Sequence, residues 1–162
     1  MSKTNTLSID EFKSIYSKVP RLTVEVILKT KDGIVLTLRK LPSWNNHWHI
    51  PGGTVLYGET LEQAIQRVAK DELGIKVKIV KLLGYISYPS EKKERGYGWS
   101  IGIAYLCKIK SGILRQNNQA KEIQIFKILP SNIINEQSTE LRILAMARQV
   151  NITAKSNRIF SP

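Results

Sequence analysis

The sequence has a single cysteine, no long hydrophobic run and few acidic residues. Cys107 alone excludes an internal disulfide, which favours a reducing cytoplasm. No stretch of about 18 apolar residues occurs, so we expect no membrane-spanning helix. The first six residues lack the apolar core of a secretion signal. Only 13 acidic residues face 25 basic ones, and the net charge of +12 favours anionic ligands such as nucleotides.

The positive charge is spread along the chain. Its nearest cluster is Lys92, Lys93 and Arg95, which lies among aromatic residues and could form a stacking surface for nucleic acid. We interpret this cluster instead as part of a solvated loop beside an edge strand. Nucleic acid is therefore not the expected partner.

The length of 162 residues and the 42% hydrophobic content predict one domain, residues 1–162, with one sizeable core. Ser8 and Glu11 form a capping box that predicts a short helix over 8–19. Residues 151–162 are expected to be a frayed basic tail. We find no internal repeat and no linker.

Hydrophobic spacing predicts alternating strands and helices along the rest of the chain. The expected strands cover 21–30, 34–40, 48–50, 76–88, 99–109 and 121–129. A hairpin turn at 31–33 should join the first two strands, the polar segment 89–98 should be a mobile loop, and a last helix should cover 139–150. This order predicts an α+β fold.

The segment 51–75 organises the chain as a glycine loop, a helix and a stop. Thr60 and Gln63 form a second capping box, and Gly74 supplies a left-handed helix end. An arbitrary helix of this kind is most often a salt-bridged surface helix. Here, however, Asp71 and Glu72 follow a glycine loop, and such carboxylates suit Mg²⁺ and a diphosphate.

These residues resemble the Nudix box, at the spacing that the box requires. The matching residues are Gly53, Glu59, Arg67, Ala69, Glu72, Gly74 and Ile75, with Asp71 in place of a glutamate. Val68 departs from the box, which has a glutamate there. The GDP-mannose mannosyl hydrolases lack the same glutamate, and the segment 20–74 is similar to theirs. That resemblance implies one Mg²⁺ and attack by water at the sugar carbon.

The resemblance implies the Nudix fold, a mixed sheet between helices, and a set of site residues. The Gly52 carbonyl, Asp71 and Glu72 should hold Mg²⁺, or Mn²⁺ in its place. Glu59 should tether the Arg67 side chain, while Gly53 and Gly74 are structural. The implied substrate-binding residues are Glu25, Arg39 and Lys40, and the implied catalytic residues are Arg67, Glu72 and Glu122.

The general base is the open point of the resemblance. Relatives take a histidine and a metal-binding glutamine from the loop before the last strand, where this chain has Ala120 and Lys121. Glu122 could serve as the base, and Gln119 could supply the amide if the register shifts by one. The only two histidines, His47 and His49, are expected to be structural.

Three functions follow from the residues and the resemblance. The first is a Mg²⁺-dependent hydrolase of a nucleoside diphosphate sugar such as GDP-mannose. The second is a pyrophosphohydrolase that cuts between phosphates, and the third is a catalytically silent nucleotide- or RNA-binding module. The resemblance also suggests a homodimer, because relatives are often dimers.

Overall fold

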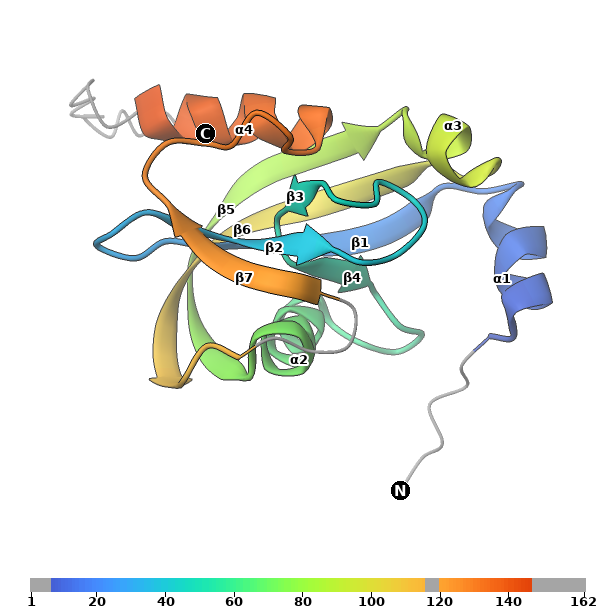
Figure 1. The fold of residues 1–162 in the computed structure, drawn as a ribbon. Coiled ribbons are helices and arrows are strands. Elements are labelled where there is room, and N and C mark those ends of the chain that lie inside the picture. Colours follow the sequence, from blue (N-terminus) through green and yellow to red (C-terminus); the bar gives the residue numbers. More distant parts are fainter. Residues whose placement is uncertain (1–6, 116–119, 147–162) are drawn as a thin grey trace, which may run out of the picture.

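The computed structural model describes residues 7–115 and 120–146. Figure 1 shows the fold. In chain order, its elements are α1 (Ile9–Tyr16), β1 (Arg21–Leu28), β2 (Ile34–Arg39), β3 (Trp48–His49), β4 (Gly52–Thr54), α2 (Leu61–Leu73), β5 (Ile75–Tyr88), α3 (Glu91–Arg95), β6 (Ser100–Gly112), β7 (Ala120–Phe126) and α4 (Asn135–Met146). Among the described residues, no helix is long and apolar enough to cross a membrane.

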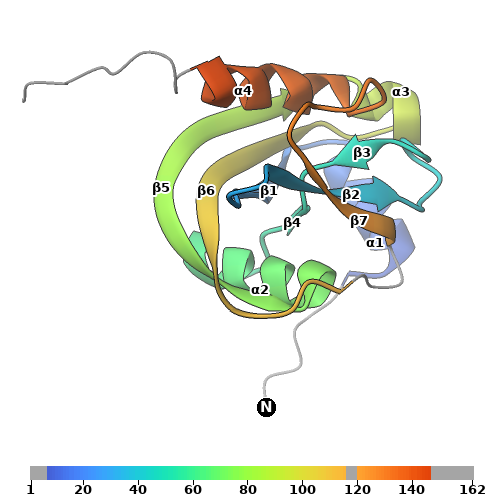
Figure 2. The ribbon, with the colours of Figure 1, turned by 60° about the vertical axis from the view of Figure 1, so that its left-hand side comes forward.

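The strands form two sheets. The larger sheet has the order β4-β1-β6-β5, with β1 parallel to β6 and the other pairs antiparallel. The smaller sheet, β3-β2-β7, is antiparallel throughout. Helix α2 lies on one side of these strands and α4 on the other, as Figure 2 shows. The predicted α+β class with strands between helices is confirmed, although the strands divide into two sheets.

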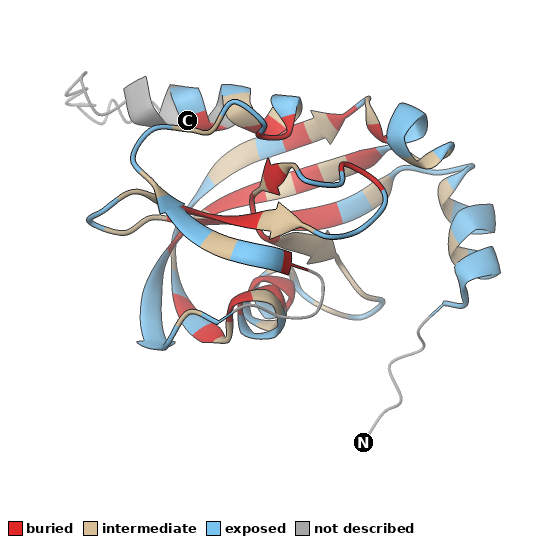
Figure 3. Ribbon diagram, viewed as in Figure 1, coloured by how far each residue is buried: buried red, intermediate tan, exposed pale blue. Residues whose placement is uncertain are grey.

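The core has two halves that meet at β1. Val24, Val26 and Leu28 pack with the buried face of α2, whereas Ile27 packs on the side of α4. Burial on both faces makes β1 the central strand, coloured largely red in Figure 3. Trp48 belongs to the second half of the core and packs edge to face on Phe126, with 4.7 Å between the ring centroids.

The predicted hairpin between the first two strands is only partly correct. Its turn exists, because the Thr30 amide donates to the Gly33 carbonyl at 2.9 Å. Beyond one isolated bridge between Lys29 and Ile34, however, β1 and β2 separate into different sheets. They separate because β4 and β6 occupy both hydrogen-bonding edges of β1.

The two outer helices differ from their predicted ranges. The Ser8 capping box forms, but α1 ends at Tyr16 and buries no residue, so the apolar spacing of 8–19 does not mark a core face. Helix α4 begins at Asn135, four residues before the predicted start. The predicted end of that helix and the tail 151–162 lie outside the described residues.

Candidate active site

The segment that resembles the Nudix box folds as the sequence predicts, except at Gly52 and Gly53. Helix α2 begins at a Thr60 capping box and ends at Gly74, whose φ of 72° is the left-handed conformation that glycine favours. Gly52 and Gly53 are not in a loop, because they pair with β1 as strand β4. A side chain at Gly53 would press on Val68, at 3.0 Å from its Cγ2 atom.

The predicted tether of Arg67 is present. Its Nε and Nη2 atoms donate to the two carboxylate oxygens of Glu59 at 2.7 and 2.8 Å. Nη2 also donates to the Thr54 carbonyl at 2.8 Å, and Glu59 accepts a bond from the Leu56 amide. Hydrogen bonding from Arg67 lowers the pKa of Glu59. This pair fixes the segment before α2 against the helix.

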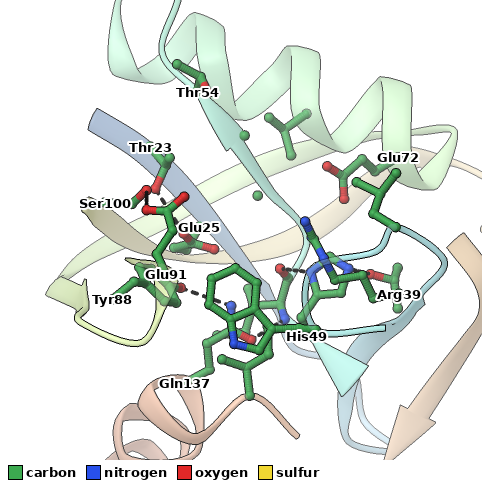
Figure 4. A pocket seen from close by; sticks show the side chains of 18 of the residues that line it. Thr23, Glu25, Arg39, His49, Thr54, Glu72, Tyr88, Glu91, Ser100 and Gln137 are labelled. Carbon is green, nitrogen blue, oxygen red and sulfur yellow. Dashed lines mark hydrogen bonds between the residues drawn. The ribbon is translucent and has the colours of Figure 1, made fainter. Parts of the chain in front are cut away.

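A cavity of about 340 Å³ opens beside the end of α2 (Figure 4). The predicted site residues that line it are Glu25, Arg39, Gly52, Gly53, Arg67, Asp71 and Glu72. Lys40 and Glu122 do not line it, and both side chains are exposed. Lys40 lies just past the end of β2. Glu122 is on β7, where it pairs with Leu38 of β2. It lies two residues after Ala120, and Ala120 does line the cavity.

Glu25, one of the implied substrate-binding residues, is buried in this cavity. Only 5% of it is exposed, and its carboxylate lies between Gly52 on β4 and Gly102 on β6. The Thr23 hydroxyl donates to it at 3.1 Å. Burial raises the pKa of Glu25 to about 8. The two glycines make room for a carboxylate that alanine would displace.

Glu72 projects from α2 toward Arg39, as Figure 4 shows. Burial raises the pKa of Glu72 to about 7, while Arg39 and a hydrogen bond from the Gly52 backbone act in the opposite direction. Arg39 donates to the Ser43 carbonyl at 2.6 Å and to its hydroxyl at 3.2 Å. The Arg39 guanidinium also lies over the Trp44 ring, 5.7 Å from its centroid.

Neither histidine is arranged as a base. His49 Nδ1 lies 2.8 Å from the Ile50 carbonyl, which can only accept, so Nδ1 carries the proton. Its Nε2 atom therefore accepts from the Thr37 hydroxyl, at 3.0 Å. Burial lowers the pKa of His49 to about 4. His47 is partly exposed, and its Nδ1 atom lies 3.1 Å from the Asn45 carbonyl oxygen. Both contacts agree with the structural role expected from the sequence.

The donor set at the end of α2 fits a hard divalent cation that shares its shell with substrate. Asp71 and Glu72 offer carboxylate oxygens, whereas Val68 offers none and is 2% exposed in the core. Within residues 7–115 and 120–146, no three His, Cys, Asp or Glu side chains could together hold a metal ion. Mg²⁺ commonly binds through one or two carboxylates plus phosphate oxygens and water, which suits this pair.

One wall of the cavity, which includes α3, was not predicted from the sequence. Residues 89–98, expected to be a mobile loop, contain this helix, and Glu91 is only 2% exposed. Glu91 accepts from Arg21 at 2.6 Å and from the Ser100 hydroxyl. Further along, Gln137 accepts from the Ile50 amide at 2.7 Å and donates to the Tyr88 hydroxyl at 2.9 Å. Gly96, which ends α3 in the left-handed conformation, was a local signal for this helix.

Comparison with known proteins agrees with this geometry. The family model of the NUDIX domain matches residues 19–143. The chain is 37% identical over 127 residues to the low-salt glycan biosynthesis protein Agl8 of Haloferax volcanii, covering 76% of this chain and 81% of that protein. It is 33% identical over 109 residues to an ADP-ribose pyrophosphatase of Methanocaldococcus jannaschii, covering 67% and 63%.

Solved structures show the same fold. A MutT NUDIX hydrolase from Burkholderia pseudomallei aligns with a TM-score of 0.69 at 23% identity, covering 76% of this chain and 97% of that one. A UDP-X diphosphatase aligns with a TM-score of 0.64 at 19% identity, covering 88% and 73%. Nudix hydrolases generally use divalent metal ions such as Mg²⁺. This chain belongs to the NUDIX domain family and is a Nudix hydrolase.

Proposed function

We propose that this chain is a Mg²⁺-dependent hydrolase of a nucleoside diphosphate sugar, with GDP-mannose as the first substrate to test. The observation that carries the proposal is that Asp71 and Glu72 open into the same cavity as Arg39. Carboxylates that can hold a cation and a guanidinium that can bind a phosphate thus face one space. The name of the Agl8 relative, a glycan biosynthesis protein, supports a sugar-containing substrate.

Each residue has a defined task in this proposal. Asp71, Glu72 and the Gly52 carbonyl would hold Mg²⁺, and the bound ion would neutralise charge on the diphosphate. Arg39 would bind a phosphate oxygen, since its guanidinium is held by Ser43 and Trp44 at the cavity wall. Arg67 positions the segment before α2 through Glu59. Because Val68 offers no ligand, this site should hold fewer cations than a box with a third carboxylate at that position.

The second candidate is cleavage between the two phosphates. It is supported by the relative named ADP-ribose pyrophosphatase and by the structural neighbour named UDP-X diphosphatase. This alternative keeps Glu122 as its base, although Glu122 is exposed and does not line the cavity. A homodimer stays a prediction from the resemblance, and a cytoplasmic location stays a prediction from the single cysteine.

Hydrolysis of a panel of nucleoside diphosphate sugars with Mg²⁺ in ¹⁸O water tests the proposal. Label on the released sugar supports attack at the sugar carbon. Label on a phosphate product contradicts that chemistry and favours the second candidate. No turnover of any nucleotide, together with steeply salt-dependent RNA binding, would favour a silent binding module.

A further inference from the structure

We propose that Arg95 is a substrate-binding residue, which binds a phosphate group of the substrate together with Arg39. Arg95 is the last residue of α3, in the segment that the sequence analysis expected to be a solvated loop. It lines the same cavity as Arg39, Asp71 and Glu72. The inference rests on the proposed function, because it names a residue for the diphosphate of that substrate.

Arg95 shares its carboxylate partner, Glu91, with Arg21. Glu91 Oε1 accepts from Arg21 Nη2 at 2.6 Å, and Oε2 accepts from the Ser100 hydroxyl. Arg95 Nε lies 3.1 Å from the same Oε1 atom, yet this buried nitrogen makes no hydrogen bond in the described part of the chain. One carboxylate thus serves two guanidinium groups, which leaves one positive charge in excess.

All three guanidinium nitrogens of Arg21 donate hydrogen bonds within the protein, so the excess charge is assigned to Arg95. Its Nε donates to Ser100 at 3.0 Å, its Nη1 donates to Thr54 at 3.3 Å and its Nη2 donates to Glu91. Its side chain is only 14% exposed. Arg95 is therefore the guanidinium of this cluster that has donors to offer a ligand.

Arg39 is the second cation of the proposed phosphate site. Its guanidinium donates to Ser43, which is neutral, and among the residues that the structure describes no carboxylate bonds to it directly. Burial lowers the pKa of Arg39 to about 10, and repulsion from the charge of Arg95, which lines the same cavity, lowers it further. A phosphate between them would replace that repulsion with two attractions.

Helix α3 is held firmly enough to present Arg95 to a ligand. Glu91 joins it to β1 and β6, and Glu94 accepts from the Trp44 amide at 3.2 Å. The Ser90 amide, just before the helix, donates to Glu136 on α4 at 3.1 Å. Three separate parts of the fold thus fix the position of this short helix. A preorganised guanidinium binds an anion with little loss of conformational entropy.

Lys93 provides a matched control for the test. It lies two residues from Arg95 on the same helix and carries the same charge, but it is exposed and does not line the cavity. Lys93→Ala therefore reproduces the change in net charge of Arg95→Ala without removing a cavity residue. Any difference between the two variants reports direct contact, since long-range attraction changes equally in both.

The experiment measures the dissociation constant of inorganic pyrophosphate, with Mg²⁺ present, by calorimetry. We expect Arg95→Ala to weaken binding about 10- to 100-fold, the range of a hydrogen bond to a charged group. Arg95→Lys should lie between this variant and the wild type, because lysine keeps the charge but not the planar fork. Lys93→Ala should stay within about twofold of the wild type.

Two results would overturn the inference: equal affinity of Arg95→Ala and Lys93→Ala, or no binding of pyrophosphate by the wild type. If Arg95→Ala does not fold, as judged by circular dichroism, Arg95→Gln decides in the same way. The proposed function fails separately. If pyrophosphate binding depends on Arg95 but no sugar nucleotide is hydrolysed, the phosphate site stands and the hydrolase proposal does not.

Discussion

The cavity has two walls of different origin. The box wall, residues 52–74, comes from one continuous segment, and its Arg67–Glu59 pair spans eight positions. The α3 wall consists of Arg21, Tyr88, Glu91, Arg95, Ser100 and Gln137, drawn from five elements. There the Arg21–Glu91 pair spans 70 positions, and the bond from Ile50 to Gln137 spans 87. Spacing in the sequence can therefore reveal the first wall but not the second.

The two walls also differ in how their charges are balanced. In the box wall, Arg67 is paired with Glu59, and the carboxylates of Asp71 and Glu72 line the cavity. In the α3 wall, Glu91 lies between two arginines, so the excess charge is positive. The cavity thus offers carboxylates at one wall and a guanidinium at the other. A diphosphate with its cation matches both.

The largest effect should come from the box wall. Glu72→Gln should lower turnover of the best sugar nucleotide on the order of 10³-fold, because it removes a carboxylate that holds the cation. The fold should survive, with an unchanged circular dichroism spectrum. Glu62→Gln is the control, since Glu62 is exposed on the same helix. Near-full activity of Glu72→Gln would refute the cation site.

A smaller effect, on stability, should separate the two glycines that flank Glu25. The three atoms nearest an alanine Cβ at Gly102 would all belong to Glu25, with Oε1 at 2.5 Å, whereas a Cβ at Gly52 would also lie 2.8 Å from the Val24 carbonyl. Each alanine should cost about 1–3 kcal/mol in the free energy of unfolding, measured in urea. In a Glu25→Ala background the cost of Gly102→Ala should vanish, while that of Gly52→Ala should persist. Equal costs in both backgrounds would show that Glu25 is not the obstacle.

The pH dependence of stability tests the burial of Glu25. Burial raises its pKa from about 4.5 to about 8, so the folded state holds the proton more tightly than the unfolded state. This contribution to stability is complete below about pH 4.5 and is lost as the pH rises through 8. In EDTA, the wild type should therefore lose free energy of unfolding relative to Glu25→Gln between pH 5 and 8. Parallel curves for the two proteins would contradict the burial.

The smallest effects should come from the two predicted residues outside the cavity. Because both side chains are exposed and neither lines the cavity, Lys40→Ala and Glu122→Gln should each keep activity within about threefold of the wild type. The initial rate on the best substrate checks this expectation. A loss of 100-fold or more in Glu122→Gln would restore Glu122 as the general base.

Much of the fold followed from local patterns, and the errors have a common cause. The range of α2 was predicted correctly because Thr60, Gln63 and Gly74 specify its ends through contacts within a few residues. Residues 89–98 were predicted to be a loop because their polar composition hides a helix whose anchors lie far away in the chain, such as the partners of Glu91 on β1 and β6. Likewise, nothing near Glu25 in the chain shows that Gly52 and Gly102 cover it.

The sequence by itself determined the box helix, its Arg67–Glu59 tether and the family, because these depend on residue types at short, fixed spacings. Only the tertiary structure decided that Glu25 is buried, that Lys40 and Glu122 lie outside the cavity and that Arg95 faces it. Burial and charge balance depend on which distant segments pack together. That packing belongs to the whole chain and is absent from any one stretch of it.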